Sequence, residues 1–265
     1  MSFKKISCEN INAKVICMKP ISSKKMNNWK RLFPKIEVEP AVVGKNVDLS
    51  DTTKVSPLVR YQVGSKSARN SSIYAMPSVG GIGCYLSHTK CISWCRDNNQ
   101  PLVVVEEDVE FSEEAIQTIR NCLTIVPNDC DYLSLMYIRQ KEVNSYNNVF
   151  NRIHGGNDGA QCYVIFPSGA EKILKHCYPI TTQIDLFIGI IANLYPEFKG
   201  YALKKRLYSI WDVVSDNFNT SIQDFAIKKY LPDNNSFYWV VVGVMILLIV
   251  LTIYFYKKNK SHTVI

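Results

Sequence analysis

Hydrophobic positions along the first two thirds of the chain follow two patterns in turn. Short apolar runs predict strands, and apolar residues three and four positions apart predict helices. Strands are expected at 13–18, 36–43, 102–105, 132–136, 149–153 and 162–166. Helices are expected at 23–33, 81–98, 112–122 and 168–177. This alternation predicts an α/β fold in which helices flank a mixed, mostly parallel sheet.

Two stretches show neither pattern. Residues 45–78 are rich in serine, lysine, aspartate and threonine and contain the breakers Pro57 and Gly64, so we expect an irregular, mobile loop there. Residues 154–160 read HGGNDGA, and this composition predicts a flexible turn that leads into the strand at 162–166.

The C-terminal part of the chain contains a long apolar run at 237–256, FYWVVVGVMILLIVLTIYFY. A helix of this length rises about 30 Å, which matches the hydrocarbon core of a bilayer. Aromatic residues stand near both ends of the run, as expected at membrane interfaces. The sequence therefore predicts a folded domain at 1–233, a transmembrane helix at 234–256 and a short basic tail at 257–265.

The first residues, MSFKKISCENINAKVICMKP, contain no apolar stretch of the length that a secretory signal needs. We therefore expect a single-pass, tail-anchored membrane protein whose N-terminal domain is cytosolic at synthesis. The lysines that follow the span argue for the opposite topology, because positive residues tend to stay in the cytosol. We favour the first topology because no signal is present.

Charge and cysteine content narrow the classes of function. The formal net charge is +8, and the tail lysines contribute three of these charges, which leaves +5 for the rest of the chain. This dispersed excess suits phosphates, nucleotide sugars, acidic polysaccharides or anionic lipids, and we expect no nucleic-acid partner. The nine cysteines cannot all pair within one chain, and we expect them to be mostly reduced in a cytosolic domain.

Three acidic residues, Glu106, Glu107 and Asp108, directly follow the apolar strand at 102–105. In open α/β sheets, ligands bind beyond the carboxyl ends of the strands. Alternate residues of an extended chain point to the same side, so Glu106 and Asp108 could share a cation while Glu107 faces elsewhere. Carboxylate oxygens suit Mg²⁺ or Mn²⁺. The alternative is a solvated strand end before an acidic helix start.

The segment GGIGCYLSH at 80–88 opens the second expected helix. Glycines there allow close approach of another backbone, and a helix N-terminus favours an anion. Four potential metal ligands follow on one helix face: Cys84, His88, Cys91 and Cys95. They extend over about 16 Å of helix, whereas zinc bonds are about 2.3 Å long. This favours a packed cysteine stripe, with His88 alone free to point to a cleft.

One further acid stands out later in the chain. Asp185 lies beside an apolar patch, in the segment TTQIDLF at 181–187, and could act as a general base. The alternative is a helix cap or an ordinary surface residue.

Together these segments resemble glycosyltransferase family 25, which contains bacterial lipooligosaccharide galactosyltransferases and the collagen galactosyltransferase domain. The matching segments follow the order of the family: VICM at 15–18, GGIGCYLSH at 80–88, VVVEED at 103–108, GAQCYVIFPSGAEKIL at 159–174 and ITTQID at 180–185. Three features depart from the family pattern. Gly81 replaces a glutamate, Glu107 replaces an aspartate, and the first strand lacks the usual Asn-Leu pair. These departures leave open whether catalysis survives.

The resemblance implies a GT-A-like fold and transfer of galactose or glucose from a UDP-sugar to a hydroxyl of a glycan, a lipid-linked acceptor or a protein. It implies Mn²⁺, or Mg²⁺, bound by Glu106 and Asp108. The residues expected at the nucleotide sugar are Gly83, Ser87, His88 and Glu107. An inverting enzyme also needs a base, for which Asp185 is the first candidate and Asp158 the second.

The short domain, the single C-terminal span and the basic charge also resemble the poxvirus tail-anchored envelope proteins of mature virions. That family has a glycosyltransferase-like fold and binds heparan sulfate. The resemblance implies location in a virion membrane and glycosaminoglycan binding in host-cell attachment, with little or no catalysis. A third hypothesis is a membrane-tethered α/β protein that uses neither ligand. It predicts that alanine at Glu106 and Asp108 causes only small stability effects.

Overall fold

The structure, a computed structural model, describes residues 2–65 and 75–207, which belong to one compact unit. Within these two ranges, no helix is both long and apolar enough to cross a bilayer. The transmembrane helix predicted at 234–256 and the tail predicted at 257–265 lie outside the described residues.

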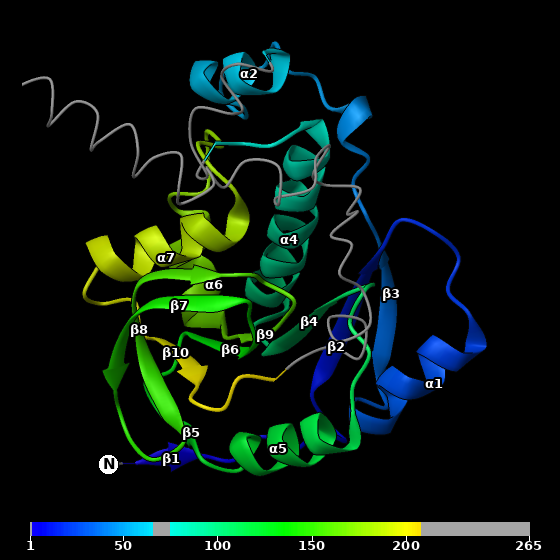
Figure 1. The fold of residues 1–265 in the computed structure, drawn as a ribbon, viewed down its shortest axis with the longest axis vertical. Helices are drawn as coiled ribbons and strands as arrows, with labels where there is room; N and C mark the ends of the chain where they lie inside the picture. Colours follow the sequence, from blue (N-terminus) through cyan, green and yellow to red (C-terminus); the bar gives the residue numbers. More distant parts are fainter. Residues whose placement is uncertain (1, 66–74, 208–265) are drawn as a thin grey trace, which may run out of the picture. The chain divides into compact units, whose positions relative to one another are not determined.

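An eight-stranded sheet forms the centre of the unit (Figure 1). Its strands, in spatial order, are β3 (Ile36–Pro40), β2 (Asn12–Cys17), β4 (Leu102–Glu106), β9 (Cys162–Ile165), β6 (Tyr132–Met136), β10 (Gly200–Leu203), β8 (Phe150–Asp158) and β7 (Arg139–Ser145). The pairs β3–β2, β2–β4 and β6–β10 are parallel. The other four neighbouring pairs are antiparallel. The sheet is therefore mixed, as expected, but the prediction of a mostly parallel sheet is wrong.

Two features account for the antiparallel pairs. Strand β9 enters between β4 and β6 and runs opposite to both, and β7 and β8 form an antiparallel hairpin at the sheet edge. A separate two-stranded sheet pairs β1 (Phe3–Lys4) with β5 (Val126–Pro127). The continuous apolar run of β4 predicts burial on both faces, which the structure confirms, but not the direction of the neighbouring strand.

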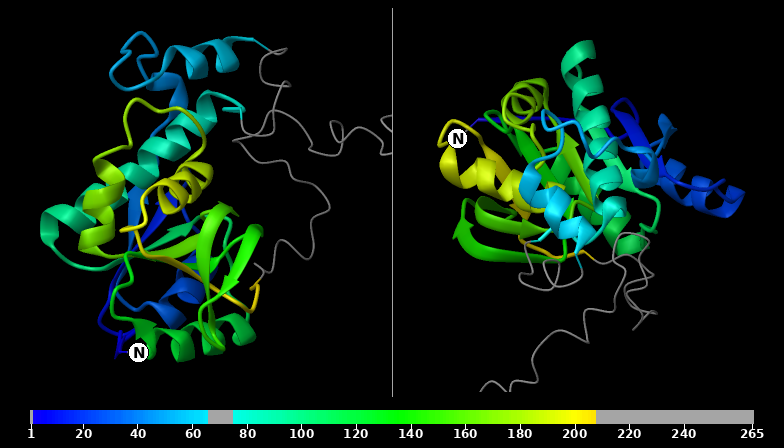
Figure 2. Two further views of the ribbon diagram at one scale, coloured as in Figure 1. Left: turned by 90° about the vertical axis from the view of Figure 1, so that its left-hand side faces the viewer. Right: turned by 90° about the horizontal axis from the view of Figure 1, so that it is seen from above.

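Helices cover both faces of the central sheet (Figures 1 and 2). They are α1 (Ser23–Leu32), α2 (Pro57–Gly64), α4 (Val79–Asn98), α5 (Glu113–Leu123), α6 (Pro167–Leu174) and α7 (Ile184–Leu194). Helices α1 and α5 share one buried core with sheet residues such as Val103. Helices α4, α6 and α7 share the second core with residues such as Val104. Alternate residues of β4 thus serve opposite layers.

Ser112 caps the start of α5, where its hydroxyl accepts a hydrogen bond from the Ala115 N–H at 3.1 Å. The irregular loop expected at 45–78 is wrong in part, because Gly44–Asn46 forms a 3-10 turn and α2 forms after the cap Ser56. Proline at the first helical position is compatible with a helix, so Pro57 starts α2 instead of breaking it.

The flexible turn expected at 154–160 is also corrected by the structure. Strand β8 continues to Asp158 because it pairs with β7 along this stretch. Gly159, with a φ of 94°, follows directly in a conformation that favours glycine. The loop expected from its glycines is thus mostly strand, and Asp158 is the last residue of that strand.

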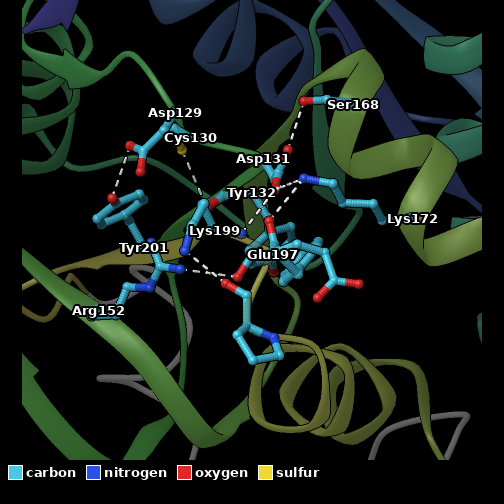
Figure 3. Close-up of polar contacts among 12 residues, drawn as sticks. Asp129, Cys130, Asp131, Tyr132, Arg152, Ser168, Lys172, Glu197, Lys199 and Tyr201 are labelled. Atoms are coloured by element: carbon cyan, nitrogen blue, oxygen red, sulfur yellow. Dashed lines mark hydrogen bonds and ion pairs between the residues drawn. The ribbon is translucent and has the colours of Figure 1, made fainter.

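Asp131 connects the start of β6 to two segments that are distant in sequence (Figure 3). Its buried carboxylate accepts hydrogen bonds from Ser168 Oγ and Lys172 Nζ, both at 2.6 Å, and from the Lys199 N–H at 2.8 Å. Ser168 and Lys172 belong to α6, and Lys199 precedes β10. The carboxylate therefore joins α6, β6 and β10 at the end of the sheet where both strands begin.

Candidate functional site

The acidic triplet at 106–108 lies at the end of β4, beside the first half of α4. A short turn after Asn99 reverses the chain, so that β4 runs back along the helix that precedes it. Glu106, the last residue of β4, lies opposite Ile16 of the parallel strand β2. Its N–H donates to the Gln161 carbonyl at 2.9 Å. Glu106 thus stands at the carboxyl ends of β2 and β4, the edge at which α/β sheets bind ligands.

His88 contacts Glu106 from α4. Its Nε2 lies 3.1 Å from Glu106 Oε1, and its Nδ1 lies 3.0 Å from the Tyr163 hydroxyl. The imidazole is buried, whereas 22% of the Glu106 side chain is exposed. Tyr163 belongs to β9 and is fully buried. Both ring nitrogens therefore have polar neighbours, and these neighbours determine how the imidazole is oriented.

Cys84 lies one helical turn before His88 and completes a group of three. One ligand atom from each of Cys84, His88 and Glu106 lies within 4.8 Å of the others. Burial raises the pKa of the Cys84 thiol well above its usual value, and the charges of Glu106, Asp185 and Asp108 raise it further. The charges of three carboxylates, from β4, the turn after it and α7, therefore act on the same thiol.

Asp185 lies in the first turn of α7 and is half-buried. Its Oδ2 accepts a hydrogen bond from the Gly159 N–H at 2.7 Å, and its Oδ1 accepts one from the Leu186 N–H at 2.8 Å. Burial raises the pKa of Asp185, the two backbone donors oppose this, and the charges of Glu106 and Asp158 add to it. The two candidate bases, Asp185 and Asp158, are thus electrostatic neighbours.

Glu107 points away toward the connection between β2 and α1, as predicted. It does so from a turn that follows β4, so the extended chain over 106–108 on which that prediction rested is wrong. Its Oε2 accepts a hydrogen bond from the Met18 N–H at 3.0 Å, and its carbonyl accepts one from Lys25 Nζ at 2.7 Å. The same connection lines an open pocket of about 440 Å³. The lining residues are Lys19, Pro20, Ile21, Ser23, Met26, Asn27 and Val38. Glu107 thus ties the acidic turn to the segment that forms this pocket.

Gly83 and Ser87 hold α4 against a neighbouring backbone. A Cβ atom at Gly83 would lie 2.4 Å from the Val42 carbonyl oxygen and 2.7 Å from the Gly44 nitrogen. The buried Ser87 hydroxyl donates to the Gly83 carbonyl at 2.7 Å and accepts from the Val42 N–H at 2.8 Å. The close approach that these residues allow is to backbone at 42–44, and their expected contact with a nucleotide sugar stays a prediction.

The sequence singled out Glu106, His88 and Asp185 as candidate site residues but assigned no site role to Cys84 or Tyr163. The packed cysteine stripe is confirmed for Cys91 and Cys95, which are fully buried. Cys84 is only half-buried by comparison and faces Glu106. The signal in the sequence that could have indicated a site role for Cys84 is its spacing of four residues from His88. The third member of the group comes from a strand, which helix spacing does not reveal.

Comparison with known proteins identifies the segment that carries this site. Residues 61–188 match the model of glycosyltransferase family 25 (LPS biosynthesis protein). All the predicted catalytic, cofactor and metal residues, from Gly83 to Asp185, fall within the match. No curated protein matches the chain. The resemblance to poxvirus envelope proteins stays a prediction.

Proposed function

We propose that this chain, whose residues 61–188 match glycosyltransferase family 25, transfers a hexose from a UDP-sugar to a hydroxyl acceptor in a metal-dependent reaction. The family match indicates glycosyltransferase activity, with a sugar donor and a glycan or lipid acceptor in general. The supporting observation is the position of Glu106 at the carboxyl ends of β2 and β4, where His88 and Cys84 of α4 lie beside it. Galactose or glucose as the sugar, and attachment to a membrane through 234–256, belong to the same proposal.

The pocket beside β2 is our candidate site for the nucleotide. Lys19 and the N-terminal residue of α1, Ser23, line it and provide a positive charge and a helix N-terminus suited to a diphosphate. The apolar side chains Ile21, Met26 and Val38 line the same pocket and could pack against a base. Glu107 contacts Met18 and Lys25, which are next in sequence to the lining residues Lys19 and Met26. We therefore propose that the phosphates of a bound nucleotide lie on the side of the acidic turn.

Glu106 and Asp108 are the residues that would hold Mn²⁺ or Mg²⁺. Glu106 is half-buried and Asp108 is exposed, so both offer hard oxygen ligands at a position that solvent and substrate can reach. A cation there would offset the charge that develops on the leaving diphosphate. The chain itself fixes Glu106 through the backbone pairing of β4 with β2 and through the contact with His88.

Asp185 is the first candidate for the base that takes the proton of the acceptor hydroxyl. Its raised pKa makes its carboxylate a stronger base than that of an exposed aspartate. Each carboxylate oxygen accepts one backbone hydrogen bond and keeps a lone pair for the acceptor. Asp158 is the second candidate, and its charge contributes to the raised pKa of Asp185.

The experiment uses the full-length chain in detergent. Binding and hydrolysis of UDP-galactose and UDP-glucose are measured with and without Mn²⁺. We expect metal-dependent turnover that is lost in the Glu106→Ala/Asp108→Ala variant. Glu113→Ala/Glu114→Ala is the matched control, because it also removes two carboxylates, from the exposed start of α5. Unchanged turnover in the first variant would contradict the proposal.

A heparin-binding measurement with the same protein tests the second candidate function. Heparin binding that weakens as salt is added, from a folded chain with neither UDP-sugar binding nor turnover, would favour the glycosaminoglycan-binding surface protein. Absence of all three activities, with wild-type behaviour of the acidic variant, would instead favour the tethered protein that uses neither ligand.

A further inference from the structure

Cys84, His88 and Glu106 form a group of potential metal ligands that differs from the acidic pair considered above. We propose that these three side chains bind one divalent metal ion of the zinc class and leave its fourth position open. Nothing in the family match assigns this site. It goes beyond the proposed function, with which it shares Glu106 and His88.

All three ligands stand on rigid elements. Cys84 and His88 are four residues apart on α4 and therefore lie on one helix face. Glu106 is the last residue of β4, which is paired on both sides with β2 and β9. Their ligand atoms already lie within 4.8 Å of one another. The four potential ligands of α4 alone extend too far along the helix to bind one zinc ion. This objection does not apply here, because β4 supplies the third ligand.

The spacing of the ligand atoms fits a tetrahedral ion. Two tetrahedral nitrogen and oxygen ligands, with zinc bonds of about 2.0 to 2.1 Å, lie about 3.3 Å apart. In the structure, His88 Nε2 and Glu106 Oε1 are 3.1 Å apart. The corresponding sulfur–nitrogen separation is about 3.6 Å. Atoms within 4.8 Å of one another thus need to move by only about an ångström to share one ion.

Tyr163 supplies the support that a metal-binding histidine usually has. Its buried hydroxyl lies 3.0 Å from His88 Nδ1, on the opposite side of the ring from Glu106. When Nε2 binds a metal, Nδ1 carries the ring proton, and this N–H donates a hydrogen bond to the Tyr163 hydroxyl. Such a partner fixes the tautomer and the ring orientation of a ligand histidine.

The charges around the group also favour a cation. Glu106 brings a carboxylate into the group, and 22% of its side chain is exposed. Within the described residues, no lysine or arginine forms an ion pair with Glu106, and its carboxylate lies 3.1 Å from His88 Nε2. A bound cation would offset this local negative charge and allow the thiol to release its proton to solvent and bind as a thiolate.

The donor types select the class of metal. Thiolate and imidazole ligands favour zinc and similar transition metals, whereas Mn²⁺ and Mg²⁺ prefer oxygen ligands alone. Three protein ligands with one open position are typical of catalytic zinc sites. The group at Cys84 therefore has a metal preference different from that of Glu106 and Asp108.

Cobalt(II) is the probe, because cobalt bound to a thiolate has an intense sulfur-to-metal charge-transfer absorption. The full-length chain in detergent, freed of metal and kept reduced, is titrated with Co²⁺ without any sugar nucleotide. We expect one Co²⁺ per chain, with this absorption band. The band should be lost in Cys84→Ala and retained in Cys91→Ala, which removes a buried thiol from the same helix.

Two further variants test the remaining members of the group. Tyr163→Phe should keep the band and weaken Co²⁺ binding by about 10- to 100-fold, because it removes only the support of His88. Glu106→Gln, at a partly exposed position, should weaken binding by at least about tenfold. It also provides a test if Cys84→Ala fails to fold, which circular dichroism would reveal.

A folded wild-type chain without the band, or a band that Cys84→Ala leaves unchanged, would overturn the proposal and leave His88 and Glu106 as a simple hydrogen-bonded pair. The outcome is independent of sugar transfer. Cobalt binding without turnover contradicts only the proposed function, and manganese-dependent turnover without cobalt binding contradicts only this site.

Discussion

At the scale of single residues, we expect Asp185 to produce the clearest pH dependence of turnover and of stability. Burial raises its pKa, and the charges of Glu106 and Asp158 contribute in the same direction. A base acts only when it is deprotonated, so we expect UDP-sugar turnover to fall on acidification at a pH above the ordinary range for aspartate, about 3.9. The measurement is the pH profile of turnover. Asp185→Asn should remove turnover at every pH, and a variant as active as the wild type would exclude Asp185 as the base.

The same raised pKa has a consequence for stability. A folded-state pKa above the unfolded value means that the folded chain binds the proton more tightly. The stability that Asp185 contributes is therefore fully present below the pKa of the unfolded chain. The free energy of unfolding falls as pH rises from that value through the raised pKa of the folded chain, and the loss is complete above the folded-chain pKa. Urea unfolding across that window should show a smaller pH-dependent loss in Asp185→Asn than in the wild type. Identical pH dependence in both proteins would contradict the raised pKa.

At the scale of elements, the position of α4 depends on backbone contact at Gly83. A Cβ there would meet backbone atoms of Val42 and Gly44 at 2.4 and 2.7 Å, and backbone cannot rotate away as a side chain can. We expect Gly83→Ala to lower the free energy of unfolding by about 1 to 3 kcal/mol. Because α4 carries Cys84 and His88, cobalt binding should weaken in the same variant. Urea unfolding and the cobalt titration measure the two effects.

Gly64→Ala is the matched control for this prediction. A Cβ at Gly64, the last residue of α2, meets no atom within 4 Å. Alanine is favoured over glycine in a helix, so this variant should be as stable as the wild type or more stable by up to about 1 kcal/mol. Equal effects of the two substitutions would show that the contact with 42–44 does not constrain α4.

At the scale of the whole molecule, Asp131 joins parts that are brought together only by folding. Its carboxylate holds α6 and the start of β10 to the start of β6. Asp131→Ala leaves the Lys199 N–H and the Ser168 hydroxyl without this acceptor, and we expect a loss of roughly 3 kcal/mol in the free energy of unfolding. Chemical denaturation measures it. The exposed Asp97→Ala should change stability by less than about 0.5 kcal/mol, and a similarly small effect at Asp131 would show that the connection is dispensable.

Most elements were predictable because their signals are local. Apolar spacing identified α1, α4, α5 and α6, and the apolar runs identified β2, β4, β6 and β9 within a few residues. The sequence reading missed α2 within a polar stretch, and it did not assign α7, which carries Asp185. It also took the glycine-rich end of β8 for a turn, since its pairing with β7 is a tertiary contact that outweighs local composition.

Local patterns in the sequence are enough to establish the α/β class, the acidic residues at the end of β4 and the placement of Cys84 and His88 on one helix face, because each follows from periods of two or 3.6 residues. The three-dimensional structure was needed to show that β9 runs antiparallel between β4 and β6. It also shows that Glu106, rather than Cys91 or Cys95, completes the group with Cys84 and His88. Strand direction and ligand grouping depend on contacts between distant residues, and local spacing carries no information about them.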